Sequence, residues 1–499
     1  MTIQTRWAHV LDSARSAFRT APPPAAPGLH TYSLHLEGGQ RRVHLRIEPG
    51  GSGALFVDVT DVIHLNATAV AMVKSALDGV PQAQAVAQLA RQYRGVARAE
   101  LTRATVSMYD LAAQIAGAQL RSNGFGCPTC AMATHLDFLP VFSTPVTAPY
   151  KADLALTYAC NNACPHCYNE PERFAMGSLA TEDWYQVLDI LAGIGVPHVI
   201  LTGGEPTLLP FLPDLVKYAD GLGQIVGMNT NGRRLAEQGF AASLAVAGLN
   251  HVQVTLESCI PAVHDRMVAT PGAFDETVRG IRNALASGLH TITNTTVTRE
   301  NQGHVLDTVR FVHDLGLTTF ALNGIIYAGG GSATPNAIPA EEMAALLSAV
   351  RDEAETLGMR FLWYTVTDYC RLSPLALGLA PKRCNAAEYS ICIEPNGDVL
   401  PCQSYYVSAG NILSDPWDAI WNSDLFLSFR DREQASAAQL PAGCWGCLDL
   451  EMCGGGCRLE HEAHPALSAS GQVRAAEHGC ARARLRASGQ AVAVPVARE

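Results

Sequence analysis

Between about residues 150 and 370, short apolar stretches typical of β-strands alternate with longer stretches of helical periodicity. The apolar stretches include ADLALTYAC, HVILTGGEP and HVQVTLES, and each precedes a helical pattern. Six such units in succession require a parallel sheet with right-handed crossovers, and a barrel is the natural way to close it. The sequence therefore predicts an α/β fold built on a partial (β/α)6 TIM-type barrel over residues 150–370.

Composition limits the classes of protein and partner. The chain has 499 residues, of which 48% are hydrophobic and 16% charged, which indicates a folded globular protein. No apolar run reaches the roughly 18 residues needed to span a bilayer, and the first residues lack the apolar core of an export signal. We therefore expect a cytoplasmic protein without a membrane partner. The net charge of −11 argues against nucleic acid, because binding phosphates requires a basic surface.

The chain contains 15 cysteines, which in a reducing compartment are more often metal ligands or catalytic groups than disulfides. Three of them, Cys160, Cys164 and Cys167, lie in the run CNNACPHCYNEP. A structural zinc needs four ligands, and His166 is poorly placed to be the fourth because it is adjacent to Cys167. A 4Fe–4S cluster normally takes four cysteines. Three thiolates would therefore leave one iron free to bind a small molecule.

This Cys-x3-Cys-x2-Cys spacing, directly after the first predicted barrel strand, resembles the signature of the radical S-adenosylmethionine (SAM) enzymes. In that family the open iron binds the amino and carboxyl groups of SAM. The resemblance implies that SAM is cleaved reductively to methionine and a 5′-deoxyadenosyl radical, which then removes a hydrogen atom from a substrate carbon. It also implies a low-potential electron donor, such as flavodoxin or ferredoxin.

Other short runs resemble the SAM-binding motifs of the same family. GGEP, at 203–206, matches the motif that contacts the methionine amino group, and VTLES stands where the family usually has SLDG. His166 takes the position of an aromatic side chain near the adenine. The residues that the resemblance implies for SAM binding are His166, Gly203, Gly204, Glu205, Pro206, Thr255, Glu257 and Arg266.

A second group of seven cysteines follows the predicted barrel, and its spacing resembles the SPASM extension of radical SAM enzymes, which holds two auxiliary 4Fe–4S clusters. The resemblance assigns Cys384, Cys402 and Cys457 to the first auxiliary cluster. It assigns to the second auxiliary cluster Cys444, Cys447, Cys453 and Cys480. Cys392 either completes the first auxiliary cluster or is a buried strand cysteine that leaves one iron open to substrate. The alternative is a pair of zinc knuckles, since Cys-x2-Cys is also a zinc spacing.

Five further positions refine this interpretation. The run ICIEPNGDVLPC, which ends at Cys402, is expected to form a hairpin. In the sulfatase-maturing branch, the residue after the last cysteine of this hairpin is usually an aspartate that acts as a base. Here that residue is Gln403, and an amide cannot take a proton. Sulfatase maturation is therefore disfavoured. Cys127 and Cys130 form a Cys-x2-Cys pair of unknown role before the barrel. Cys259 and Cys370 are expected to be buried small side chains, although Cys259 follows a barrel strand and could face the cavity.

The region before the barrel has a different pattern. Residues 29–120 predict a small sheet followed by three helices, which is a winged-helix order, with Asn66 placed to cap the first helix. Winged helices commonly bind DNA, but these helices mix acidic and basic residues. The strands, an LN-x-T run and a DG pair resemble the peptide chaperone of pyrroloquinoline quinone biosynthesis (a PqqD-like domain). That resemblance implies that the leader of a precursor peptide adds as an extra strand to the sheet edge.

Together these features predict a radical SAM oxidoreductase with three 4Fe–4S clusters that cross-links or oxidises a ribosomally made precursor peptide. One alternative is a SPASM enzyme acting on a small molecule such as a haem precursor, and another is a non-catalytic iron–sulfur electron carrier. No general base is identified. The predicted segments are an N-terminal segment with a Pro-rich linker (1–28), the recognition domain (29–120), a linker (121–149), the barrel (150–370), the SPASM domain (371–485) and a tail (486–499).

Overall fold

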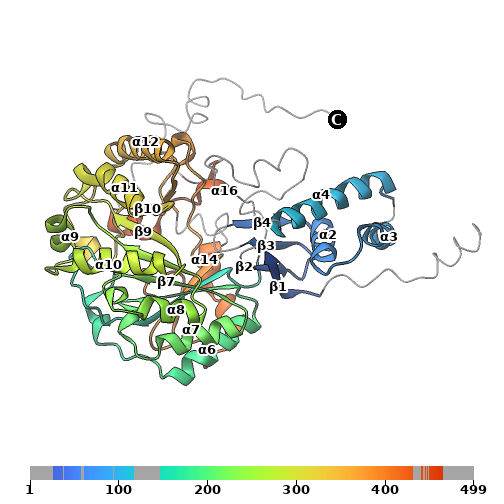
Figure 1. The fold of residues 1–499 in the computed structure, drawn as a ribbon, viewed down its shortest axis with the longest axis horizontal. Helices are drawn as coiled ribbons and strands as arrows, with labels where there is room; N and C mark the ends of the chain where they lie inside the picture. Colours follow the sequence, from blue (N-terminus) through green and yellow to red (C-terminus); the bar gives the residue numbers. More distant parts are fainter. Residues whose placement is uncertain are drawn as a thin grey trace, which may run out of the picture. The chain divides into compact units, whose positions relative to one another are not determined.

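The computed structural model describes residues 26–36, 39–57, 61–93, 95–116, 146–430, 440–441, 444, 447 and 449–464 (Figure 1). The chain divides into two compact units, which meet in sequence at Pro145 and Val146. Cys127, Cys130 and Cys480 lie outside the described residues, so the predictions about them stay predictions.

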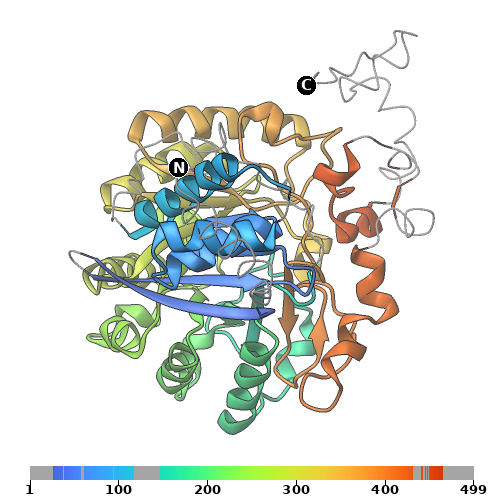
Figure 2. The same cartoon turned by 90° about the vertical axis from the view of Figure 1, so that its right-hand side faces the viewer.

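The first unit consists of a four-stranded antiparallel sheet in the order β1-β2-β3-β4, with helices packed on it (Figure 2). Its elements are β1 (Gly28–Leu36), β2 (Gly39–Ile47), β3 (Gly53–Val57), β4 (Asp61–Leu65), α2 (Ala67–Leu77), α3 (Gln82–Gln92) and α4 (Arg98–Ala116). The predicted cap of the first helix is confirmed, because the Asn66 side chain accepts a hydrogen bond from the Ala69 amide at 2.9 Å. Strand β4 was not predicted, since only five residues separate the end of the DVT run from this cap. Its inward residues Ile63 and Leu65 join the core of the unit.

The second unit is built on a nine-stranded sheet in the order β11-β10-β9-β8-β7-β6-β5-β12-β13. Strands β5 to β11 are parallel and follow one another in sequence order, and the first six of them, β5 to β10, are the strands that the alternating pattern predicts. Strand β12 adds to β5 in parallel, and β13 pairs with β12 in the opposite direction. The strands are β5 (Lys151–Thr157), β6 (His198–Gly203), β7 (Ile225–Thr230), β8 (His251–Thr255), β9 (His290–Thr296), β10 (Thr319–Asn323), β11 (Arg360–Trp363), β12 (Ser390–Ile393) and β13 (Val399–Leu400).

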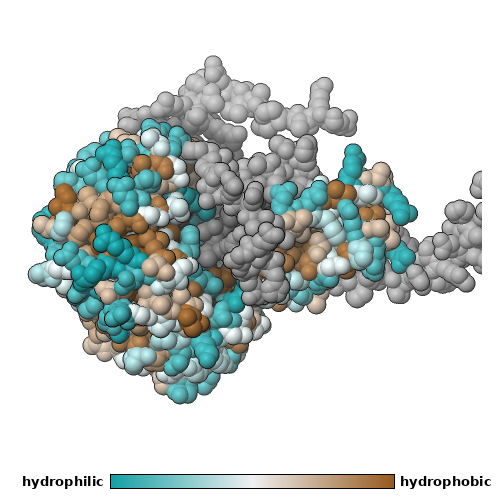
Figure 3. Space-filling view, in the orientation of Figure 1, coloured by the Kyte–Doolittle hydropathy of each residue, from teal (hydrophilic) through white to brown (hydrophobic). Residues whose placement is uncertain are grey.

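Helices follow most of the parallel strands and lie around the periphery of the second unit (Figure 1). They are α6 (Thr181–Gly193), α7 (Leu212–Gly221), α8 (Phe240–Ala247), α9 (Pro261–Met267), α10 (Ala273–Ala286), α11 (Val305–Asp314) and α12 (Ala340–Leu357). None of the helices in the described part of the chain is long and apolar enough to span a bilayer. Hydrophilic and hydrophobic residues are interspersed on the face of this unit that Figure 3 shows.

The two faces of the parallel sheet differ in polarity. Because side chains alternate along a strand, Val252 and Val254 of β8 share one face, and both are fully buried. Gln253 and Thr255 share the other face and are only partly buried. In register with them lie Asn229 of β7 and Asn294 of β9, so one face of the sheet carries a row of polar side chains. Such a face can bind a polar ligand.

At the amino ends of the strands, the buried His251 meets the partly buried His198. The Nε2 atoms of His198 and His251 are 3.0 Å apart. The His251 ring packs against Gly227 and fills the space of a side chain there, since a Cβ added to Gly227 would lie 2.0 Å from the ring. Burial, followed by the charges of His290 and Lys151, lowers the pKa of His251 to about 3. His251 is therefore neutral in the folded protein at neutral pH.

Acidification is expected to destabilise the fold through His251. In the unfolded chain its pKa returns to about 6.5, so the unfolded state binds the additional proton between about pH 6.5 and pH 3, and stability falls as the pH drops through that window. At this site, lowering the pH from about 7.5 to about 5.5 should cost roughly 1.4 kcal/mol. Thermal unfolding of the wild type and of His251→Gln at both pH values measures this, and the variant should lose less stability. Equal losses in the two proteins would contradict the prediction.

Candidate active site and cluster-binding segments

The three cysteines of the CNNACPHCYNEP run lie in one loop directly after β5. All three are free thiols; Cys160 is exposed, while Cys164 and Cys167 are partly buried. Burial holds the pKa of Cys164 well above its ordinary value, and the charges of Glu257, Cys167 and Cys160 raise it further. The charges of Cys160 and Cys167 thus affect the pKa of Cys164, as expected for three thiols in one site. Sulfur donors of this kind suit a soft metal centre such as an iron–sulfur cluster.

In the part of the chain that the structure describes, no three His, Cys, Asp or Glu side chains converge closely enough to hold a single metal ion. The donor set of the loop is nevertheless the one that a 4Fe–4S cluster takes, apart from the missing fourth thiolate. A backbone amide already supports one sulfur, since the Asn162 N–H donates to the Cys160 sulfur at 3.4 Å. The residues present therefore fit a cluster with one iron left for another ligand.

A glycine pair at the end of β6 packs against the beginning of this loop. The Gly204 amide donates to the Thr157 carbonyl at 2.6 Å, and the Glu205 amide donates to the Ala159 carbonyl at 2.9 Å. A Cβ added to Gly204 would lie 2.3 Å from the Ala159 oxygen and 2.5 Å from the Tyr158 oxygen. Gly203 adopts a φ of +126°, which favours glycine. Only glycines let the two backbones come this close.

Glu205 is completely buried and joins the ends of two strands. Its carboxylate accepts hydrogen bonds from the Thr207 amide at 3.1 Å, the Thr207 hydroxyl at 2.5 Å, the Thr230 hydroxyl at 2.8 Å and the Asn231 amide at 2.8 Å. Burial raises the pKa of Glu205, although these hydrogen bonds oppose the shift. Pro206, the first residue of the short helix η2 (Pro206–Leu208), is also buried. The GGEP run therefore orders the carboxyl ends of β6 and β7 beside the cysteine loop.

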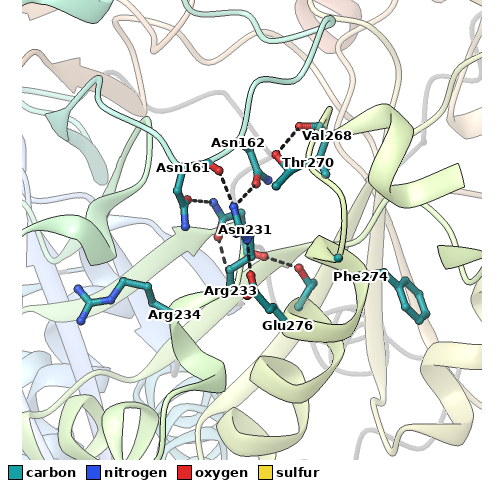
Figure 4. A network of polar contacts seen from close by, with 12 residues as sticks. Asn161, Asn162, Asn231, Arg233, Arg234, Val268, Thr270, Phe274 and Glu276 are labelled. Carbon is teal, nitrogen blue, oxygen red and sulfur yellow. Dashed lines mark hydrogen bonds and ion pairs between the residues drawn. The ribbon is translucent and has the colours of Figure 1, made fainter. Parts of the chain in front are cut away.

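An arginine that sequence reasoning missed holds the cysteine loop from the other side (Figure 4). The Arg233 guanidinium donates to the Asn161 carbonyl and, at 3.0 Å, to the Asn162 side chain, and it pairs with Glu276 of α10 at 2.6 Å. The Asn231 amide group donates to the Asn161 side chain at 2.6 Å. The NTNG run at residues 229–232 overlaps the end of β7 (Ile225–Thr230), but nothing in the sequence indicates that the following arginine reaches back to residues 161–162.

Two of the residues predicted to bind SAM, His166 and Glu257, contact each other. Glu257 follows β8 and is 1% exposed; its carboxylate is 3.2 Å from His166 Nε2 and accepts from the Thr296 amide at 2.8 Å. Burial opposes protonation of His166, but the hydrogen bond and charge of Glu257 outweigh it and raise the pKa of His166. Thr255 ends β8 two residues earlier. The structure thus gathers these side chains at the carboxyl end of the sheet.

Arg266, another residue predicted to bind SAM, is placed differently. Its side chain is 56% exposed on α9 and forms an ion pair with Glu300 at 3.0 Å. Because this guanidinium already has a carboxylate partner, it would have to exchange that partner to bind the carboxylate of a ligand.

The cysteines after the sheet form two groups. Burial, followed by the charge of Cys384, raises the pKa of Cys402 to about 12. The same two causes, in the same order, raise the pKa of Cys457. These three thiols therefore lie near one another. Cys392 is completely buried on β12, and the charge of Cys402 adds to the effect of burial in raising its pKa well above its ordinary value.

The second group contains Cys444, Cys447 and Cys453. Burial, followed by the charges of Asp368 and Cys453, raises the pKa of Cys444 to about 12. The prediction that Cys370 is buried is wrong, because this residue is exposed on a turn near the second group. Cys259, also expected to be buried, is only partly buried.

Tyr406 connects the hairpin that carries Cys402 to the cysteine loop. Its hydroxyl is 3.2 Å from the Tyr168 carbonyl and 3.1 Å from the Asn169 side-chain oxygen, and the Arg173 guanidinium lies 4.0 Å above its ring. Arg173 also pairs with Glu394, which follows β12. The cysteine loop and the first cysteine group are thus joined by direct contacts.

Comparison with known proteins defines the class. Residues 154–312 match the radical SAM superfamily, and residues 384–448 match the SPASM iron–sulfur cluster-binding domain. The chain is 31% identical over 325 residues to the mycofactocin maturase MftC of Mycobacterium ulcerans, covering 63% of this chain and 85% of the relative. It is 28% identical over 320 residues to the AdoMet-dependent heme synthase of Oleidesulfovibrio alaskensis, covering 61% and 81%.

A solved structure resembles the fold over most of the chain. Streptococcus suis SuiB, in a crystal structure bound to precursor peptide SuiA, superposes with a TM-score of 0.61 at 16% identity and covers 83% of this chain and 94% of SuiB. The protein is therefore an enzyme of radical chemistry with an iron–sulfur appendage. It belongs to the radical SAM superfamily and carries a SPASM domain.

Proposed function

We propose that this radical SAM enzyme cross-links or oxidises a ribosomally made precursor peptide, which it recruits through its first unit. The observation that carries the proposal is the four-stranded antiparallel sheet ahead of the radical SAM unit. A small-molecule enzyme has no need of such a sheet, whereas a peptide can add to it as a further strand. The similarity to a mycofactocin maturase and the likeness of the fold to SuiB support a peptide substrate.

Strand β1 is the edge at which we place the leader. Among the described strands it pairs only with β2, and its nine residues offer a longer row of backbone groups than the five of β4 at the opposite edge. Tyr32 and Leu34 of β1 pack against the core of the unit, which fixes the strand in place. Backbone hydrogen bonds would supply affinity and the alternating side chains specificity. The first unit would then be the PqqD-like winged-helix recognition domain.

In this proposal the thiols of the second unit hold three 4Fe–4S clusters, and the unit is the partial barrel of the family. Cys160, Cys164 and Cys167 would hold the first cluster, which supplies an open iron for SAM. Cys384, Cys402 and Cys457 would hold the first auxiliary cluster, and burial of Cys392 beside Cys402 makes it a candidate fourth ligand. The second auxiliary cluster would use Cys444, Cys447, Cys453 and a further thiolate.

Residues of the chain would position SAM and the substrate. The contacts proposed for SAM come from His166, the GGEP run, Thr255, Glu257 and, after exchange of partners, Arg266. On the polar face of the sheet, the side-chain oxygens of Asn294 and Asn323 are buried without a hydrogen-bond partner among the described residues. They can accept hydrogen bonds from N–H groups of a bound ligand, as a peptide backbone offers. A cytoplasmic donor such as flavodoxin or ferredoxin would supply the electron.

The test combines the reconstituted full-length enzyme with SAM, dithionite and each short peptide encoded beside the gene, all without oxygen. One peptide should bind, stimulate the formation of 5′-deoxyadenosine and lose hydrogen atoms by mass spectrometry. A tetrapyrrole haem precursor with propionate side chains serves as the comparison substrate. Modification of the tetrapyrrole and of no peptide would favour the small-molecule alternative. A non-catalytic electron carrier, in contrast, would form no 5′-deoxyadenosine under any of these conditions.

A further inference from the structure

The peptide group between Asn161 and Asn162 contacts a cysteine sulfur on one side and a charged side chain on the other. Its N–H, which belongs to Asn162, donates to the Cys160 sulfur at 3.4 Å. Its carbonyl, which belongs to Asn161, accepts a hydrogen bond from the Arg233 guanidinium (Figure 4). Because a peptide group is planar and conjugated, one rigid amide links the guanidinium to the cysteine sulfur.

Arg233 reaches this carbonyl from a turn that is packed closely on its surroundings. A Cβ added to Gly280 of α10 would lie 2.0 Å from the Gly232 carbonyl oxygen, and one added to Gly232 would lie 2.6 Å from the Val254 side chain. The Arg233 side chain is 16% exposed, and its Nε donates to Glu276 of α10 at 2.6 Å. The guanidinium is therefore held in place, and solvent screens its charge only weakly.

Side-chain amides fix the same peptide group in its orientation. The Asn231 amide group donates to the Asn161 side-chain oxygen at 2.6 Å, and its own oxygen accepts from the Arg233 backbone amide at 3.0 Å. The Arg233 guanidinium also donates to the Asn162 side-chain oxygen at 3.0 Å. The turn after β7 thus holds both residues of the peptide group, so that its N–H stays directed at the Cys160 sulfur.

A cation on the carbonyl side of an amide strengthens the amide as a donor, because hydrogen bonds in a chain polarise one another. Hydrogen bonds to the cysteine sulfurs and nearby charges are among the factors that set the reduction potential of an iron–sulfur cluster. Reduction adds one electron from a low-potential donor and makes the sulfurs more negative. A stronger N–H donor and a nearby cation therefore both favour the reduced state.

We propose that Arg233 is a positioning residue that raises the reduction potential of the cluster on the cysteine loop, acting through the peptide group between Asn161 and Asn162. Glu276 offsets part of the arginine's charge and so limits the increase. Both residues thereby adjust how readily the donor's electron enters the cluster. The proposal rests on the assignment of the first cluster to this loop, but it does not depend on the substrate being a peptide.

A redox titration of the reconstituted full-length enzyme, followed by electron paramagnetic resonance without oxygen or substrate, tests the proposal. The signal of the first cluster is the part of the spectrum that Cys164→Ala lacks. In Arg233→Gln the ratio of reduced to oxidised first cluster at a fixed potential should fall about ten-fold, which corresponds to about 59 mV for one electron. Arg233→Lys, which keeps the charge, should recover most of the ratio. Glu276→Gln, which keeps an acceptor oxygen but loses the charge, should raise the ratio.

Arg234→Gln is the matched control, since it removes a positive charge from the next residue. Arg234 pairs with Glu237 at 2.9 Å, and its side chain extends away from Asn161 and Asn162 (Figure 4). This control should keep the wild-type potential.

Opposite shifts in Arg233→Gln and Glu276→Gln would support the proposal, because a purely structural role predicts no such change of sign. Unchanged potentials in both variants, shifts in the same direction, or an equal shift in Arg234→Gln would overturn it. If Arg233→Gln holds too little iron to give the signal, Glu276→Gln decides, and a potential that is not raised contradicts the proposal. Since no substrate is present, the result is independent of whether a peptide is modified.

Discussion

Replacing Cys164 by alanine is expected to abolish the formation of 5′-deoxyadenosine from SAM, while both auxiliary clusters remain. Cys164 lies between the other two cysteines of its loop, and the charges of both contribute to raising its pKa. Two thiolates cannot hold a cluster that also keeps an iron open for SAM. With the three clusters proposed above, about four of about twelve iron atoms per chain should be lost. The measurements are 5′-deoxyadenosine by chromatography and iron and sulfide per chain after anaerobic reconstitution.

Cys259→Ala is the matched control for this variant. Cys259 is also a partly buried cysteine of the second unit, but it lies after β8, where its backbone amide donates a hydrogen bond to the Thr308 hydroxyl at 3.0 Å. This control should keep its full iron content. Continued cleavage of SAM by Cys164→Ala would refute the assignment of the first cluster to this loop. Loss of nearly all iron would show instead that the variant fails to fold.

The features that could be predicted from the sequence are those that local spacing determines. Strands β5 to β10 and the cysteine loop depend on short runs of residues, so their patterns are visible in the chain itself. Strand β11 was missed, since its four residues are too few to give a clear pattern. The hairpin of β12 and β13 was expected, but its addition to the sheet at β5 was not. That pairing joins positions more than 200 residues apart, for which no local signal exists.

The contacts around the candidate site show the same division. The chemical types of the thiols and of Glu205 and Glu257 indicated the site from sequence alone. The contacts around these groups could not be predicted, because they come from distant parts of the chain. The Asn231 amide donates to Glu205, the Thr296 amide donates to Glu257, and Arg233 donates to the Asn161 carbonyl in the cysteine loop.

Replacing Gly204 by alanine is expected to lower the rate of SAM cleavage by about a hundred-fold or more. The added Cβ would lie 2.3 Å from the Ala159 carbonyl oxygen and 2.5 Å from that of Tyr158, so the backbone that leads into Cys160 must shift by roughly 1 Å. A displacement of this size at a reacting group costs about a hundred-fold in rate. Single-turnover formation of 5′-deoxyadenosine, normalised to the iron content, measures the effect.

Gly221→Ala supplies the matched control, because Gly221 is a helical residue of α7 at which an added Cβ would have nothing within 4 Å. Alanine favours a helix over glycine by up to about 1 kcal/mol, so this control should be as stable as the wild type or more so, and fully active. Gly204→Ala should differ from it in activity even where both variants hold the same amount of iron. If the two variants cleave SAM equally fast, the close approach of the two backbones does not position the cysteine loop for catalysis, and the fit of these glycines is a matter of packing alone.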